Sequence, residues 1–387
     1  MSPLSKVLLH DIHLSHAKQL AQFEVPRSRN APQEDAPPTL FADTINWIKA
    51  NKAAVQAAQA AQCRSPNPNS PNWDTVFFSL MESDAVYLRR FGEVYDAIVA
   101  ARAGDLELAV THLAKAQEDV DTVAAMLDCT FIQLCDFASR SPDGYWYHAG
   151  AYCGVFVSNS TSKPFMGVAY KGTSNAREVV TDLDWDPIAP ALPGVAWGAL
   201  VHQGFYGGLF GTFSAAQGAQ IPFDVMLAQL TATYRSREKA VLHFTGHSLG
   251  GAYCTLTYAE FLRQQAAPQF KNFVFGDMYS YGSPRVCLQP FATQVNSLTQ
   301  AGTGKYVFRI VNRDDPVCTV PPRTVAQIPA YPFIHVGGAW KLADSGPHKM
   351  IQEPPPVDPQ SVVDIIWNVK NHQTSDYYAS WQKTPHS

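Results

Sequence analysis

The apolar residues of the first 140 positions recur at helical spacing. Three helices are predicted: one over residues 39–62, one over about 74–103, and one that begins after Asp105 and continues to Leu134. Asp105 is suited to cap the third helix, because its carboxylate can accept hydrogen bonds from free amides of the first turn. The repeated apolar positions are Phe41, Ile45 and Ile48 in the first helix, Phe77, Leu80, Tyr87, Phe91, Val94 and Ile98 in the second, and Leu106, Ala109, Leu113, Ala116, Val120, Val123, Leu127, Phe131 and Leu134 in the third.

The chain divides where this pattern changes. Residues 1–38 are polar and end in P-Q-E-D-A-P-P, which predicts a flexible N-terminal arm. Residues 39–140 are predicted to form a helical extension packed on the domain that follows. A regulatory or docking module is the alternative, and both interpretations stay open because this stretch carries no recognisable chemical motif.

From residue 145 to 387 the pattern alternates between strands and helices. Short β-rich runs at 151–158 and 164–170 predict a hairpin. Later strands are expected at 241–245, 272–281 and 305–311, with helices over about 222–234 and from the turn after 245 to about 265. Such alternation predicts an α/β fold, in which a mostly parallel central sheet carries helices on both faces.

The composition describes a globular protein with a large core, since 46% of the 387 residues are hydrophobic and 16% are charged. The net charge of −4 provides no basic field for a polyanion, so nucleic acid is excluded as a partner. We expect neither a cofactor nor a metal, because no phosphate-binding loop and no metal-ligand spacing stands out. No apolar run approaches the roughly 18 residues of a membrane span.

The cysteines and the first residues bear on the cellular compartment. Seven cysteines, an odd number without a C-x-x-C pair, argue for reduced and buried thiols. The first sixteen residues contain one continuous apolar run, Val7-Leu8-Leu9, whereas a secretory signal needs about 7–15 apolar residues. A cytoplasmic location is therefore expected, and secretion is the alternative if a signal has been removed.

The stretch Val241–Ala252 combines a strand, a sharp turn and a helix around a serine. Its G-H-S-L-G-G has the G-x-S-x-G form of the nucleophile elbow of α/β-hydrolases. Gly246 and Gly250 suit this turn because the backbones on either side of Ser248 cross closely, where a Cβ would clash. The amide of Leu249, at the start of the helix, can donate to an oxyanion. A glycine-rich loop with an incidental serine is the alternative, and the flanking strand and helix disfavour it.

A serine nucleophile needs a histidine base and an acid that orients this base, in the chain order serine, acid, histidine on this fold. The acid is expected in the loop after the strand 305–311, where Asp314 and Asp315 are adjacent. Successive side chains of an extended loop point in opposite directions, so one of the two enters the site. His372 is the favoured base because it lies in a late polar loop. Other histidines are disfavoured as the base. His335 lies in a strand-like run, His348 is expected at the surface, and His386 lies in the C-terminal tail. His243 and His247 are interpreted as buried packing residues.

Spaced motifs over about residues 150–381 resemble those of the class 3 (fungal-type) lipases. They are A-Y-K-G-T-S (169–174), V-H-Q-G-F (201–205), G-H-S-L-G-G (246–251), Y-G-S-P-R-V (281–286), R-I-V-N-R-D-D-P-V-C-T-V-P-P (309–322) and the late histidine before aromatic residues. The resemblance implies an α/β-hydrolase fold, with Asp315 as the acid and with Thr173 and Leu249 as the oxyanion residues. Two positions depart from the family pattern, since Lys171 stands in place of an arginine and Cys318 in place of a proline.

The same resemblance places a lid at about residues 174–200. This segment contains large apolar side chains without a helical or strand pattern, namely Trp185, Ile188, Leu192, Val195 and Trp197. Such groups must be buried against other parts of the protein. They form either a permanent cap on the core or a flap over an acyl-chain cleft, and the position beside the oxyanion strand favours the flap.

The expected function is hydrolysis of carboxylic esters through an acyl-enzyme, with Ser248, His372 and Asp315 as the catalytic residues. Acylglycerols are the favoured substrates, met at a lipid–water interface. An esterase acting on feruloyl or short-chain esters is the alternative, because that activity shares the fold. A lipid-binding protein without turnover is less favoured, because the serine, acid and histidine are all present.

Overall fold

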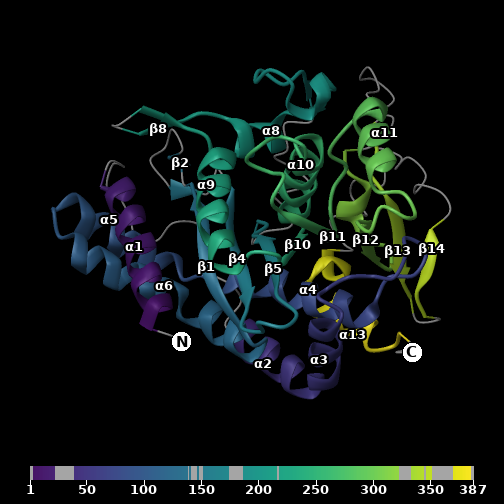
Figure 1. Cartoon of the computed structure of the whole chain (residues 1–387), viewed down its shortest axis with the longest axis horizontal. Coiled ribbons are helices and arrows are strands. Elements are labelled where there is room, and N and C mark those ends of the chain that lie inside the picture. Colours follow the sequence, from purple (N-terminus) through teal and green to yellow (C-terminus); the bar gives the residue numbers. More distant parts are fainter. Residues whose placement is uncertain are drawn as a thin grey trace.

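A computed structural model of the chain is organised around one eight-stranded sheet (Figure 1). It describes residues 3–21, 39–137, 139–140, 146–147, 151–173, 186–215, 218–321, 333–343, 346–350 and 369–384. Among these residues, no helix has both the length and the apolar character needed to cross a membrane.

The sheet has the strand order β1-β4-β5-β10-β11-β12-β13-β14. The strands from β5 to β13 run parallel to one another, whereas β1, β4 and β14 are antiparallel to their neighbours. Their bounds are β1 Cys129–Asp136, β4 Tyr152–Ser158, β5 Phe165–Tyr170, β10 Val241–His247, β11 Val274–Tyr281, β12 Val307–Asn312, β13 Gly338–Leu342 and β14 His348–Met350. Three two-stranded ribbons accompany the sheet: β2 Ser139–Arg140 with β3 Trp146–Tyr147, β6 Pro187–Ile188 with β7 Val201–His202, and β8 Phe213–Ala215 with β9 Gly218–Gln220.

Helices cover both faces of the sheet, and each face has its own apolar core. One face carries α8 Gln203–Phe210, α9 Pro222–Tyr234, α10 Leu249–Arg263 and α11 Gln289–Leu298. The other face carries α2 Leu40–Ala50, α3 Lys52–Ala60, α4 Trp73–Ala85 and α13 Thr374–Trp381. Strand side chains alternate between the cores, so Val241 faces α4 while Leu242 faces α10. The predicted architecture, a mostly parallel sheet between helical layers, is confirmed.

A third group of helices lies beyond the β1 edge of the sheet (Figure 1). It consists of α1 Pro3–Leu20, α5 Phe91–Arg102 and α6 Leu106–Met126, with a separate small apolar core. The prediction of a flexible arm over residues 1–38 is therefore wrong for Pro3–Leu20. The polar residues His13 and His16 are buried here, and His16 Nδ1 lies 2.8 Å from Gln133 Nε2 of β1, which the polar sequence did not suggest.

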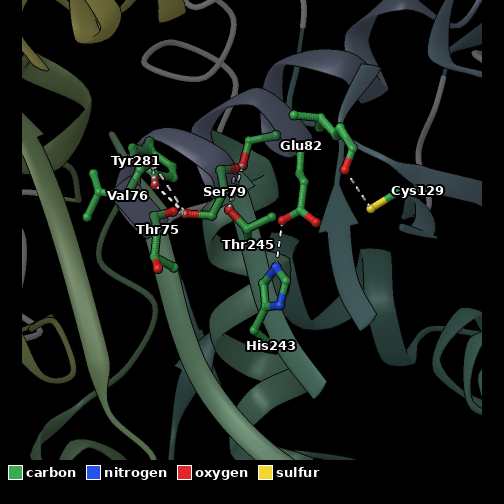
Figure 2. Close-up of polar contacts among 10 residues, drawn as sticks. Thr75, Val76, Ser79, Glu82, Cys129, His243, Thr245 and Tyr281 are labelled. Carbon is green, nitrogen blue, oxygen red and sulfur yellow. Dashed lines mark hydrogen bonds and ion pairs between the residues drawn. The ribbon is translucent and has the colours of Figure 1, made fainter. Parts of the chain in front are cut away.

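Helix α4 is buried on all sides from Thr75 to Ala85, including its polar residues. Figure 2 shows that these polar side chains bond to the two central strands. Ser79 Oγ lies 2.6 Å from the Tyr281 hydroxyl, Ser83 Oγ lies 2.6 Å from Thr245 Oγ1, and Glu82 Oε2 lies 2.6 Å from His243 Nε2. Buried polar groups are costly unless paired, so these contacts specify where α4 sits on the sheet.

The N-terminal helices are shorter than predicted. The first is interrupted at Asn51 (φ −121°, ψ 37°), and the second ends at Ala85 before the chain turns through the 3₁₀ turn η1 Val86–Leu88 into α5. The third ends at Met126, and Phe131 and Leu134 lie in β1. A strand buried on both faces is continuously apolar, so it also satisfies helical spacing. The sheet therefore begins at Cys129, inside the predicted 39–140 extension.

Candidate active site

The turn between β10 and α10 holds Ser248 in a strained conformation. Ser248 is buried and has φ 59° and ψ −130°, a region that residues with a Cβ rarely occupy. A Cβ on Gly246 would lie 2.2 Å from the carbonyl oxygen of Gly250, and a Cβ on Gly250 would lie 2.2 Å from that of Tyr170. The glycines thus permit two backbone crossings that hold the serine in place.

We expect Gly246→Ala to lower the free energy of unfolding by about 1–3 kcal/mol, because the new methyl group overlaps backbone atoms that cannot move aside cheaply. Urea denaturation measures this change. Gly207→Ala is the matched control, because nothing lies within 4 Å of an added Cβ there and alanine is favoured in helices by about 0.5–1 kcal/mol. If Gly246→Ala were as stable as Gly207→Ala, the close crossing at the elbow would be refuted.

The end of β5 passes directly beside the elbow. A Cβ on Gly172 would lie 3.0 Å from Ser248 Cβ and 2.5 Å from the His247 carbonyl oxygen. Thr173 follows Gly172 and is partly exposed, and Leu249 begins α10 with a partly buried side chain. Leu249 is therefore adjacent to Ser248 in the chain, and Thr173 is adjacent to Gly172, which lies against Ser248. Their role as donors stays a prediction.

Asp315 and His372 form a buried pair, although 57 residues separate them. His372 Nδ1 lies 2.9 Å from Asp315 Oδ2 and 3.1 Å from Oδ1. Asp315 also accepts hydrogen bonds from the Tyr377 hydroxyl at 2.6 Å and from the Val317 amide at 2.9 Å. Gly282 (φ 57°) makes room for the pair, since a Cβ there would lie 2.7 Å from Asp315 Oδ2.

This environment keeps Asp315 ionised. Burial by itself would raise the pKa of the Asp315 carboxyl, but the charge of His372 and the hydrogen bonds from His372, Tyr377 and Val317 outweigh burial and lower this pKa. An ionised Asp315 accepts the Nδ1 proton of His372. In the neutral imidazole the other nitrogen, Nε2, is then the one free to take up a proton.

Of the candidate catalytic side chains, Ser248 Oγ and His372 Nε2 are buried and have no hydrogen-bond partner within the described parts of the chain. A hydroxyl and an imidazole nitrogen are the groups between which a proton passes when a serine acts as a nucleophile. Such hydrogen bonds often tighten only in the complex with substrate. The arrangement is therefore chemically suited to nucleophilic catalysis.

The remaining candidates lie elsewhere. Asp314 is exposed and pairs with Lys341 at 2.7 Å, so the adjacent carboxylates point apart as predicted. His335 is buried, and its Nε2 lies 2.9 Å from the Cys318 carbonyl oxygen. His348 is the first residue of β14, and His386 lies outside the described residues. Of the candidate acids and late histidines, Asp315 and His372 are thus the two found in contact.

The sequence did not single out Tyr377 or Tyr87, although both contact this region. Tyr377 binds Asp315, and the Tyr87 hydroxyl lies 3.0 Å from His247 Nδ1. The segment D-Y-Y after His372 is visibly aromatic, but no spacing shows which hydroxyl reaches the acid. Lys171, the departure from the family pattern, is buried, and its Nζ lies 5.7 Å from the centroid of the Tyr87 ring.

Comparison with known families assigns this part of the chain. Residues 167–325 match the family described as Lipase (class 3). These residues are therefore similar to class 3 lipases. They include the end of β5, the elbow and Asp315. With Ser248 on the turn after a central strand of a mostly parallel sheet, the fold is the α/β-hydrolase fold of this family.

Individual relatives are also similar to the class 3 lipase segment and its surroundings. Secreted mono- and diacylglycerol lipase 1 of Fusarium solani is 31% identical over 176 residues, which are 44% of this chain and 43% of that protein. The chain thus spans less than half the length of this relative. The structure of Rhizomucor miehei triacylglyceride lipase (24% identity, TM-score 0.43) covers 65% of this chain and 81% of its own. That of lipase II from Rhizopus niveus (21% identity, TM-score 0.43) covers 66% and 82%.

The expected cytoplasmic location is wrong by this comparison, because the Fusarium relative is a secreted lipase. The expectation rested on the lack of a long apolar run near the first residue. That observation concerns one short segment and carries no information about the folded domain. The seven cysteines are all buried and none forms a disulfide, as the sequence predicted. Buried reduced thiols therefore do not distinguish between the two compartments here.

The described half of the predicted lid segment is packed against the core. Val195 is buried, and Ile188, Leu192 and Trp197 are partly buried on the core formed with α8, α10 and α11. The Ala196 amide donates to Glu260 at 2.7 Å, and this carboxylate also binds Arg263. Trp185 lies outside the described residues. These contacts favour the permanent cap over residues 186–200, and the flap stays a prediction.

Proposed function

We propose that this protein hydrolyses carboxylic esters of acylglycerols through an acyl-enzyme. The observation that carries the proposal is the buried Asp315–His372 pair near a strained Ser248 whose hydroxyl has no hydrogen-bond partner within the described chain. The match of residues 167–325 to the class 3 lipase family supports the reaction class. The Fusarium relative, named as a mono- and diacylglycerol lipase, supports the substrate class.

In the proposed reaction, Ser248 Oγ attacks the ester carbonyl carbon while His372 Nε2 takes the hydroxyl proton. Asp315 holds the imidazole through Nδ1 and stabilises the positive charge that forms. The amides of Thr173 and Leu249 donate to the oxyanion. The tetrahedral intermediate then expels the alcohol, which receives the proton from His372. Water activated by His372 attacks the acyl-enzyme in the same way and releases the carboxylic acid.

Hydrolysis of feruloyl or short-chain esters is the second candidate function. The packed segment 186–200 favours this function, because a cap held by the Ala196–Glu260 hydrogen bond leaves fewer residues to open at a lipid surface. A binding protein without turnover stays the least favoured alternative, since it would have no need of the strained Ser248.

Rates on p-nitrophenyl esters with acyl chains from C2 to C16, each below and above the micelle concentration, separate these functions. We expect the highest kcat/KM on long chains and a rise when micelles form. Monoacyl-, diacyl- and triacylglycerols then identify the preferred acylglycerol. A short-chain optimum without a rise at the interface would support the esterase instead. Lack of turnover on every ester would contradict both enzymatic proposals.

A further inference from the structure

His247, the residue before Ser248, uses both of its ring nitrogens in hydrogen bonds. Its Nε2 lies 2.7 Å from the backbone carbonyl oxygen of His372, and its Nδ1 lies 3.0 Å from the Tyr87 hydroxyl. Burial, followed by the charge of His372, lowers the pKa of His247 to about 3, so the ring is neutral at ordinary pH. With this low pKa and with both ring nitrogens in hydrogen bonds, His247 is unsuited to act as a second base.

The partners determine which nitrogen of His247 carries the proton. A carbonyl oxygen only accepts, so Nε2 must donate to His372. Nδ1 then has no proton and accepts from the Tyr87 hydroxyl. The His372 carbonyl thus selects the neutral tautomer of His247, and the Tyr87 hydroxyl supports this tautomer by donating to Nδ1. The same hydroxyl also lies 3.3 Å from the His247 carbonyl oxygen.

The rings of the two histidines are also in contact. Their centroids lie 4.5 Å apart with an interplanar angle of 31°, and the Tyr377 ring meets His247 edge-on at 5.8 Å. His247 therefore touches His372 through both backbone and ring, while Asp315 holds the Nδ1 side. These contacts restrict how far the imidazole of His372 can turn or shift.

The chain after His372 is held from the same N-terminal region. His372 ends the 3₁₀ turn η6 Val369–His372, and α13 begins at Thr374. The Thr374 hydroxyl donates to Asp84 of α4 at 2.5 Å, and Asn51 Nδ2 donates to the Tyr378 hydroxyl at 2.9 Å. Asn51 at the junction of α2 and α3, helix α4 and Tyr87 therefore hold the segment that carries His372.

We propose that Tyr87 and His247 are positioning residues that set the place of His372 relative to Ser248. The N-terminal helices then act in the reaction by holding the base, which gives them a role beyond covering the sheet. This proposal rests on the proposed function, because it takes His372 as the base. Its distinctive element is the hydroxyl of Tyr87, which lies far along the chain from the catalytic residues.

Tyr87→Phe tests the proposal because it removes only that hydroxyl. Without it, His247 can adopt the other tautomer and lose its hydrogen bond to the His372 carbonyl oxygen. We expect kcat to fall about ten-fold, since small misplacements of catalytic groups are costly, while KM changes less than about two-fold. Tyr234→Phe is the control, because that hydroxyl donates to the Ala240 carbonyl oxygen at 3.0 Å and accepts from the Val274 amide at 3.1 Å. It should leave kcat unchanged.

His247 itself offers a conservative rescue. In His247→Gln the side-chain amide can still donate to the His372 carbonyl oxygen, whereas in His247→Leu no donor remains. We expect His247→Gln to keep several-fold more activity than His247→Leu. Equal kcat values for the two, or for Tyr87→Phe and the wild type, would overturn the proposal.

Nitrogen-15 spectra of histidine-labelled protein give a readout that needs no substrate. The wild type should show His247 with its proton on Nε2, and Tyr87→Phe should shift the signals of both His247 and His372. If these shifts occurred but the wild type hydrolysed no ester, the positioning would stand and the proposed function would fail. If ester hydrolysis were present and the signals of His372 were unchanged, the positioning proposal would fail alone.

Discussion

Ser248→Ala is expected to lower kcat on any ester substrate by about 10⁵-fold or more, which is the scale for removing a serine nucleophile. The residual rate would come from binding and from the oxyanion donors. The free energy of unfolding should change by less than about 1 kcal/mol, because Ser248 Oγ has no hydrogen bond to lose within the described chain. Steady-state kinetics and urea denaturation on the same preparation measure both quantities.

Ser280→Ala provides the matched control. Ser280 is buried on β11 opposite Gly246, and its hydroxyl also has no partner within the described chain. This variant loses the same hydroxyl oxygen from the adjacent strand. Because Ser280 is not the proposed nucleophile, it should keep full activity. Equal losses in the two variants would mean that packing near the elbow, and not nucleophilic attack by Ser248, determines the rate.

His372→Gln is the second change with a large expected effect. The glutamine amide can still donate to Asp315, so the buried carboxylate keeps a partner and the cost of leaving it unpaired, about 3–5 kcal/mol, is largely avoided. An amide cannot take the serine proton. We therefore expect kcat to fall by about 10⁴-fold or more, while the folded protein remains stable enough to assay.

The control for this variant is His335→Gln. His335 is also buried, and its Nε2 lies 2.9 Å from the Cys318 carbonyl oxygen, a contact that glutamine can retain. Activity should stay within about two- to three-fold of the wild type. A large loss of kcat in His335→Gln, with activity retained in His372→Gln, would show that His372 is not the base.

Much of the catalytic half was predictable because it depends on residues close together in the chain. The glycines around Ser248 are required by backbone crossings within the same turn, and an alternation of strands and helices predicts a parallel sheet. The helix predicted over 222–234 matches α9, and the strands found at 274–281 and 307–312 begin and end within about two residues of their predicted bounds. Local spacing was enough for these features.

The helical third was predicted less well, for two physical reasons. Phe131 and Leu134 satisfied a helical stripe, yet they lie in a strand that is buried on both faces. Helix α4 buries Glu82 and Ser83 against His243 and Thr245, so its polar residues do not mark a solvent face. A hydrophobic pattern cannot distinguish a polar residue in water from one paired in the core.

What the sequence by itself determined is the elbow, the chain order of serine, acid and histidine, and the class of fold. Tertiary structure decided which groups touch: Asp315 meets His372 across 57 residues, and Tyr87 meets His247 across 160. It also decided that Asp314 turns outward to Lys341. These contacts depend on how helices pack on the sheet and how separate loops meet at its edge. Such distances are set by the whole fold, so no local spacing of residues encodes them.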